Sequence, residues 1–216
     1  MSLKSVVLVA ALFVGGAAAT AETVMLTALE RSQGWKLLFD GKDVSDWRGY
    51  RANKVPTNWT VVGGSLVGAP GVGLVSVAEF QEFELLFDWK VAEGGHGEVY
   101  FHVSEDAVAP EEIGLMVELA GHRAALAGNG LGPPDRTIPP QFDVWYRTKI
   151  VVYGKLVEYW INGERIHSYV LDSPSWRQAV AASRFAGFRD YGVLQKGNFV
   201  LVGDGVQFRN IKVRAI

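Results

Sequence analysis

A carboxylate and an imidazole alternate with apolar residues along one short segment of the chain. Glu98, Tyr100 and His102 are spaced two residues apart, with valine and phenylalanine between them. Because successive side chains of a strand point to opposite faces, this spacing predicts a strand with all three polar side chains on one face. A carboxylate and an imidazole side by side are groups that general acid–base catalysis uses.

The same alternation has a simpler structural interpretation. Antiparallel sheets commonly keep one face in the core and the other in water, so polar residues at every second position also describe a solvated outer face. His96 and His122 fit loops under this interpretation. Both alternatives require a strand at residues 98–103.

The surrounding segments predict an all-β protein. Short runs rich in valine and aromatic residues are separated by Gly, Pro, Asn and Asp about every 8–12 residues. Residues 83–91 alternate strictly, and Trp89 shares the apolar face, which indicates core packing. The runs at 146–153, 156–161 and 164–170 form a predicted meander, because two-residue Gly-Lys and Asn-Gly turns separate them.

Two features complete this outline. Residues 206–214 change the phase of their alternation, which predicts a bulge near Arg209 and Asn210. Residues 175–183 form the one good helix candidate after the N-terminal segment, entered through Pro174. No linker or repeat interrupts the strand pattern, so a single domain is expected.

Composition narrows the function classes. The chain has 216 residues, 49% of them hydrophobic and 20% charged, and a formal net charge of −2. Since no long run of basic residues is present, we expect no nucleic-acid partner. Cysteine is absent, so thiolate metal sites and cysteine nucleophiles are excluded.

The N-terminal residues predict export. Lys4 precedes an apolar stretch at residues 6–19, and Ala19-Thr20-Ala21 offers a processing site, so residues 1–21 are interpreted as a signal peptide. A membrane anchor is the alternative, but the stretch is shorter than the ~20 residues that span a bilayer. We therefore expect residues 22–34 to be a connector, residues 35–216 the domain, and the location periplasmic or extracellular, without stable membrane insertion after cleavage.

Four stretches carry a family resemblance. They are GWKLLFDGKDVSDW at residues 34–47, WTVVGGSL at 59–66, YWING at 159–163 and VQFRNIKVR at 206–214. In the order and spacing of these four stretches, the chain resembles the 3-keto-disaccharide hydrolase family. The resemblance implies a concanavalin-like jelly-roll β-sandwich of two antiparallel sheets with one short helix. It also implies an exported hydrolase that cleaves glycosides oxidised to a ketone at carbon 3, with a carbohydrate as its partner.

The resemblance also implies what the site has to do. A ketone at carbon 3 acidifies the hydrogen on carbon 2, so loss of the group on carbon 1 needs a base near carbon 2. It also needs a positive group or a metal near the ketone oxygen. The candidate catalytic residues are Glu98, His102 and Glu118, with Glu118 expected on a neighbouring strand and Lys90 beside them. The candidate substrate-binding residues are Lys90, Tyr100, His96 and His122.

A divalent metal is a possible cofactor of this site, and no other cofactor is expected. His102, Glu118 and His122 are its candidate ligands, although no tight ligand spacing supports them.

The chain departs from the family pattern at three places. HGEVYFH at residues 96–102 stands where a segment like NSGIYFH is characteristic, and Met116 stands at an acidic position. Residues 201–204 lack the Asp and His of a pattern like LQDHGD. These departures favour an alternative function, a non-catalytic carbohydrate-binding sandwich. A third alternative, an adhesive or structural protein of the cell envelope, rests only on export and the sandwich.

Overall fold

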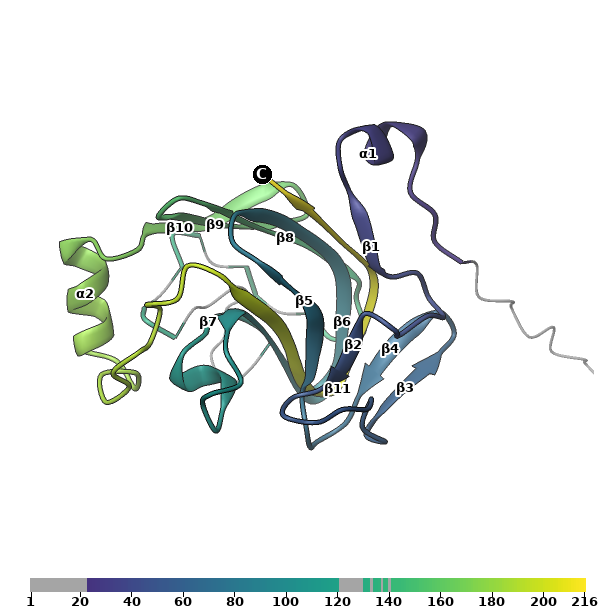
Figure 1. Cartoon of the computed structure of the whole chain (residues 1–216), viewed down its shortest axis with the longest axis horizontal. Helices are drawn as coiled ribbons and strands as arrows, with labels where there is room; N and C mark the ends of the chain where they lie inside the picture. Colours follow the sequence, from purple (N-terminus) through teal and green to yellow (C-terminus); the bar gives the residue numbers. More distant parts are fainter. Residues whose placement is uncertain (1–22, 121–129, 133, 137, 140) are drawn as a thin grey trace, which may run out of the picture.

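The computed structural model describes residues 23–120, 130–132, 134–136, 138–139 and 141–216 (Figure 1). The first strands are β1 (Lys36–Phe39), β2 (Trp47–Gly49), β3 (Trp59–Val62), β4 (Ser65–Gly68), β5 (Leu74–Phe80) and β6 (Phe83–Val103). The others are β7 (Leu115–Ala120), β8 (Tyr146–Tyr153), β9 (Leu156–Ile161), β10 (Glu164–Val170) and β11 (Gly197–Ala215). The α-helices are α1 (Ala28–Ser32) and α2 (Pro174–Ala181), and a 3₁₀ turn covers Pro110–Glu112.

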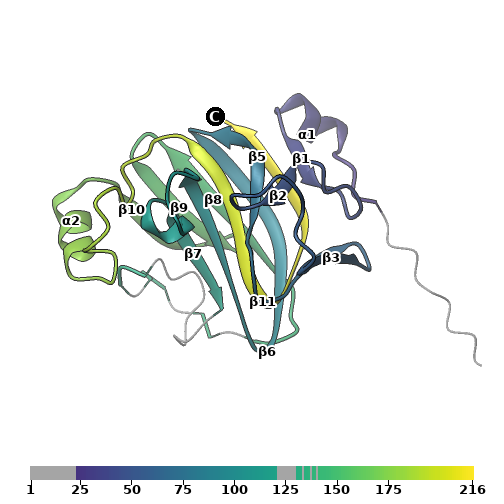
Figure 2. The same cartoon turned by 60° about the horizontal axis from the view of Figure 1, so that its bottom comes forward.

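The two longest strands bend together and so form two layers. Residues 83–91 of β6 pair with 206–215 of β11, residues 96–103 pair with 198–204, and the register shifts between these halves. Figure 2 shows both ribbons turning back at the lower edge of the molecule. Phe83 and Phe101 confirm the reversal, because their ring centroids lie 5.9 Å apart, whereas a straight strand would separate them by about 60 Å.

Glycines make this corner possible. A Cβ atom on Gly95 would lie 2.6 Å from the Asp204 carbonyl oxygen. On Gly203 it would lie 2.2 Å from Val206 Cγ1 and 2.8 Å from the His96 carbonyl oxygen. Since real Cβ atoms do not approach other atoms so closely, the corner requires glycine at both positions.

The other strands join one of two antiparallel layers, according to which half of β6 or β11 their sheet extends from. The first layer has the order β10-β9-β8-β6-β11-β4-β3, with β1 also on β11. The second has the order β7-β6-β11-β5-β2. The predicted all-β sandwich of two antiparallel sheets is confirmed.

Side-chain alternation explains the core. Phe83, Leu85, Phe87, Trp89 and Val91 are each no more than 1% exposed and point between the layers, as the sequence predicted. Trp89 keeps its indole N–H satisfied by donating to Thr148 Oγ1 at 2.8 Å.

Several local predictions are confirmed. The bulge falls at Arg209 and Asn210, where three steps of β11 oppose two of β6 and Asn210 has φ = 54°. The Asn162-Gly163 turn has positive φ at both residues, which suits a tight hairpin.

The helices lie outside the two layers. α2 follows its cap Ser173, whose side chain accepts from Trp176 N, and α1 occupies the predicted connector. Among the described residues, no helix is long and apolar enough to cross a membrane. The predicted signal peptide lies outside the described residues.

Candidate functional site

Two carboxylates meet on the outer face of the second layer. Glu98 of β6 is paired directly with Glu118 of β7, and Tyr100 is paired with Met116. Directly opposed residues of an antiparallel pair project to the same face with Cβ atoms about 4.5–5.5 Å apart. The pairing of β6 with β7 therefore brings together two of the three predicted catalytic residues.

Tyr100 fixes the orientation of Glu98. Its hydroxyl donates to Glu98 Oε2 at 2.6 Å, and the tyrosine is only 1% exposed. Burial, together with the neighbouring Glu98 charge, raises the pKa of Tyr100 well above its usual value. Tyr100 thus remains a hydrogen-bond donor, and the predicted substrate-binding residue holds the carboxylate in place.

A cation that the sequence did not predict lies beside these residues. Arg184, in the segment between α2 and β11, places Nη2 4.0 Å from Glu98 Oε1 and 3.3 Å from Met116 Sδ. Its guanidinium also lies over the Phe185 ring, 4.8 Å from the centroid. The side chain is 54% exposed, so it has room for a ligand.

A cavity of about 350 Å³ opens next to Glu98 and Tyr100. Tyr50 and Arg51 contribute to its far wall, where the Tyr50 hydroxyl donates to the carbonyl oxygens of Ser104 and Ala107, both at 3.0 Å. Burial raises the pKa of Tyr50 to about 12, so its hydroxyl keeps its proton.

An ion pair braces the same wall. The Arg48 guanidinium donates to both carboxylate oxygens of Glu105, and Glu105 also accepts from the backbone N–H of Arg51. The hydrogen bonds from Arg48 lower the pKa of Glu105, against a smaller effect of burial.

His102 does not join the predicted group. The register of β6 slips between Tyr100 and Val103, and His102 has φ = 53°, so the alternation breaks at this residue. Its ring packs edge-on against Phe83 at 5.8 Å, and Nε2 hydrogen-bonds the Gln81 carbonyl at 2.8 Å. The prediction that His102 shares a face with Glu98 is therefore wrong, because a bulge turns the side chain away. Burial lowers the pKa of this histidine.

The remaining predicted residues are dispersed. Lys90 lies on the outer face of the first layer, 5.4 Å above the Trp145 ring. The bend in β6 separates it from Glu98, so the expectation that it lies beside the carboxylates is wrong. His96 is half-buried near the corner, opposite Asp204. His122 lies outside the described residues.

The candidate metal ligands do not assemble in the part of the chain that is described. No three His, Asp or Glu residues there come close enough to hold an ion. Glu118 lies opposite Glu98, whereas His102 packs against Phe83 and bonds the Gln81 carbonyl. The predicted metal-ligand set is therefore not supported.

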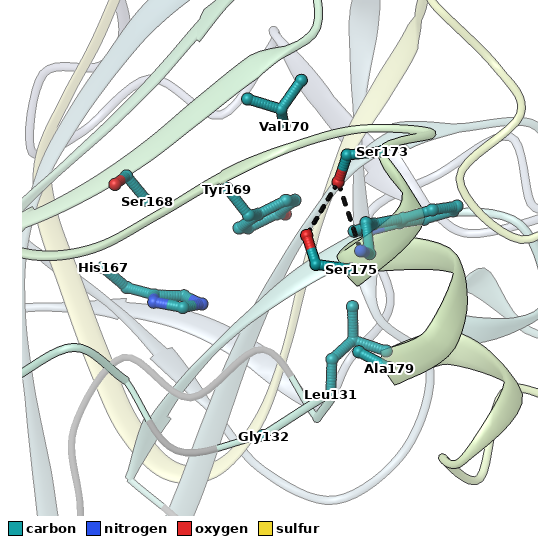
Figure 3. A pocket seen from close by; sticks show the side chains of 10 residues that line it. Leu131, Gly132, His167, Ser168, Tyr169, Val170, Ser173, Ser175 and Ala179 are labelled. Carbon is teal, nitrogen blue, oxygen red and sulfur yellow. Dashed lines mark hydrogen bonds between the residues drawn. The ribbon is translucent and has the colours of Figure 1, made fainter.

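A second cavity, of about 390 Å³, lies between β10 and α2 (Figure 3). His167 and Tyr169 of β10 face Ser175 and Leu131 across it. Asp135 Oδ1 lies 3.2 Å from His167 Nδ1. None of the predicted site residues that the structure describes lines this cavity.

Comparison with solved structures defines the class of protein. A protein from Parabacteroides distasonis ATCC 8503, assigned as a glycosyl hydrolase, superimposes with a TM-score of 0.82 at 26% identity, over 89% of this chain and 98% of that one. A β-glucanase of Bacillus licheniformis shares only the fold, with a TM-score of 0.50 at 10% identity, over 84% of this chain and 97% of that one. The chain thus has a jelly-roll fold of the glycosyl hydrolase type.

Sequence comparison then gives the family. The model of the 3-keto-alpha-glucoside-1,2-lyase-like domain matches residues 34–214, and the chain belongs to this family. A 3-keto-disaccharide hydrolase of Bacteroides thetaiotaomicron (strain ATCC 29148) is 27% identical over 230 residues, 86% of this chain and 79% of the relative. The family supports a glycoside hydrolase-like function and a carbohydrate partner.

Proposed function

We propose that this protein cleaves the glycosidic bond of 3-keto-glycosides, using Glu98, Glu118 and Arg184. The observation that carries the proposal is the cross-strand pair of carboxylates with a guanidinium beside it. A proton has to leave carbon 2, negative charge has to be held at the ketone oxygen, and the departing sugar needs a proton. The three side chains supply one group for each task.

In the first half of the reaction, the Glu98 carboxylate removes the proton from carbon 2. Its orientation is set by the hydroxyl of Tyr100. The electron pair of the C–H bond moves into an enolate whose oxygen, formerly the ketone, is stabilised by the Arg184 guanidinium.

In the second half, the enolate reforms the ketone and the bond from carbon 1 to the glycosidic oxygen breaks. Protonated Glu118 donates its proton to that oxygen, which leaves as an alcohol. The product is an unsaturated 3-keto sugar, as in a lyase, and addition of water at carbon 1 completes a net hydrolysis. The lyase-like domain family and the hydrolase relative both fit this sequence of steps.

The test is release of glucose from 3-keto-trehalose by the purified protein, with and without EDTA. We expect turnover in the wild type and loss of it in Glu98→Gln and Glu118→Gln. Glu79→Gln, an exposed residue of β5 that pairs with Lys196, is the matched control and should retain activity. Turnover that persists in both site variants would overturn the assignment of residues.

A second function, carbohydrate binding without catalysis, is favoured by one observation. Met116, at a position where the resemblance places an acid, is 1% exposed and lies against Arg184. Under this alternative, the protein would bind the sugar without turnover, and Glu98→Gln would weaken binding only.

We also propose that the protein acts after export, on the basis of residues 1–21. N-terminal sequencing of the protein from the cell envelope or medium should begin near Glu22. An intact N-terminus on protein confined to the cytoplasm would contradict export.

A further inference from the structure

A separate cavity lies at the end of the sandwich away from the corner. It has a volume of about 390 Å³, and we call it the strand-end pocket. Its lining includes Gln81, His102, Lys155, Asp172, Trp176 and Gln195. These residues come from the β5–β6 turn, the end of β6, the β8–β9 turn, α2 with the residue before its cap, and the segment entering β11. The size is within the range of about 300–1,000 Å³ typical of small-molecule sites.

The backbone of the pocket is held in unusual conformations. His102 and Asp172, neither of them glycine, have φ of 53° and 59°. Gly154 and Gly192, which also line it, have φ of 55° and 67°. Non-glycine residues in this region are strained, and such residues cluster at ligand sites. The bulge that removes His102 from the Glu98 face also places it in this wall.

The charges around the pocket compensate one another. The Asp172 carboxylate pairs with Lys155 Nζ at 3.0 Å and with Arg177 Nη1 at 2.7 Å. The Glu82 carboxylate accepts from the Gly154 N–H at 2.8 Å. Two cations and two carboxylates leave no net charge, which suits a neutral ligand and not an anion.

The remaining polar groups suit hydroxyl groups. The indole N–H of Trp176 is buried and has no acceptor among the described residues. The amides of Gln81 and Gln195 each present donors and an acceptor in one plane, as vicinal hydroxyls require. The Trp176 ring adds an apolar surface for C–H groups.

We propose that the strand-end pocket binds a neutral saccharide unit, independently of the site at Glu98. Glu98 and Tyr100 line a different cavity, and neither borders this one. The pocket would hold a sugar or part of a longer glycan without taking part in bond cleavage. This binding does not depend on the proposed reaction.

The test uses protein with ¹⁵N-labelled tryptophan and follows the indole N–H resonances by NMR. Trp176→Phe identifies the Trp176 signal, and glucose, trehalose and glucuronate are titrated separately to about 50 mM. We expect glucose or trehalose to shift this signal saturably, because a sugar bound in the pocket changes the surroundings of the Trp176 ring. Glucuronate should bind more weakly.

The variants separate the two sites. Asp172→Asn or Gln195→Ala should raise the apparent Kd at least about fivefold, whereas Glu98→Gln should leave it unchanged. Asp190→Asn, the same change at an exposed residue of the neighbouring segment, is the matched control. No saturable shift, a stronger response to glucuronate, or loss of the shift in Glu98→Gln would overturn the proposal.

Discussion

Glu98 and Glu118 are directly opposed across β6 and β7, and a third side chain, Tyr100, holds one of them by a 2.6 Å hydrogen bond. Two carboxyl groups therefore share one face. In the proposed reaction one of them acts as the base and the other as the acid, and the environment of a carboxyl determines whether it keeps its proton.

Replacement of either carboxylate should abolish most of the turnover of 3-keto-trehalose. Loss of a general acid or base typically costs about 10²–10⁴-fold, so Glu98→Gln and Glu118→Gln should each lower kcat by this amount. Because the two carboxyl groups act in one reaction, the fold-decrease in kcat of the double variant should be smaller than the product of the two single fold-decreases. Fully multiplicative effects would contradict a shared reaction.

Arg184→Ala should lower kcat by about 10²–10³-fold, since removal of one oxyanion-stabilising donor has this effect. Added guanidinium should restore part of the rate if the role is electrostatic. Arg189→Ala, a change of an exposed arginine in the same segment, should have no effect. Equal losses in both variants, without rescue, would indicate a structural role for the segment.

The Glu105–Arg48 ion pair should make the cavity wall sensitive to acid. The pKa of Glu105 is lower in the folded protein than in the unfolded chain, so its stabilisation is complete above the unfolded value of about 4.3. It is lost as the pH falls through the lower folded value. Glu105→Gln should reduce the free energy of unfolding at neutral pH by about 1–3 kcal/mol, and the difference should shrink below about pH 4. Urea unfolding at several pH values measures this, and a difference that does not change with pH would exclude the ion pair as its source.

Gly203→Ala should destabilise the corner strongly. The new Cβ would lie 2.8 Å from a backbone carbonyl oxygen, which cannot move as a flexible side chain can. A loss of about 2–4 kcal/mol in urea unfolding is expected. Gly187→Ala is the control, because an added Cβ there meets nothing within 4 Å. Similar stability in both variants would mean that the corner can relax.

The local features of this fold could be predicted because their signals are local. The alternation of residues 83–91, the bulge at Asn210 and the Asn162-Gly163 turn all depend on neighbours in the sequence. His102 could not be placed, because a bulge changes the direction of a side chain without altering the order of polar and apolar residues.

The site itself depends on tertiary geometry. Lys90 was expected beside Glu98, with residues 83–91 and 98–103 as separate strands. The structure joins both in β6, and the bend between them sends Lys90 and Glu98 to opposite sides. Gly94 and Gly95 were the available sign of that bend. The sequence around Arg184 did not indicate a role in the site. Its position depends on how the segment before β11 crosses β7.

β11 is the last strand in chain order, and it also lies inside both layers. Its neighbours β6, β5, β4 and β1 all precede it. A nascent chain lacking residues 197–215 would therefore have two half-sheets with unsatisfied edges and no means of closing them. Folding has to follow synthesis of these residues, and the pairings that close both layers join strands far apart in the sequence, which is typical of slowly folding β proteins.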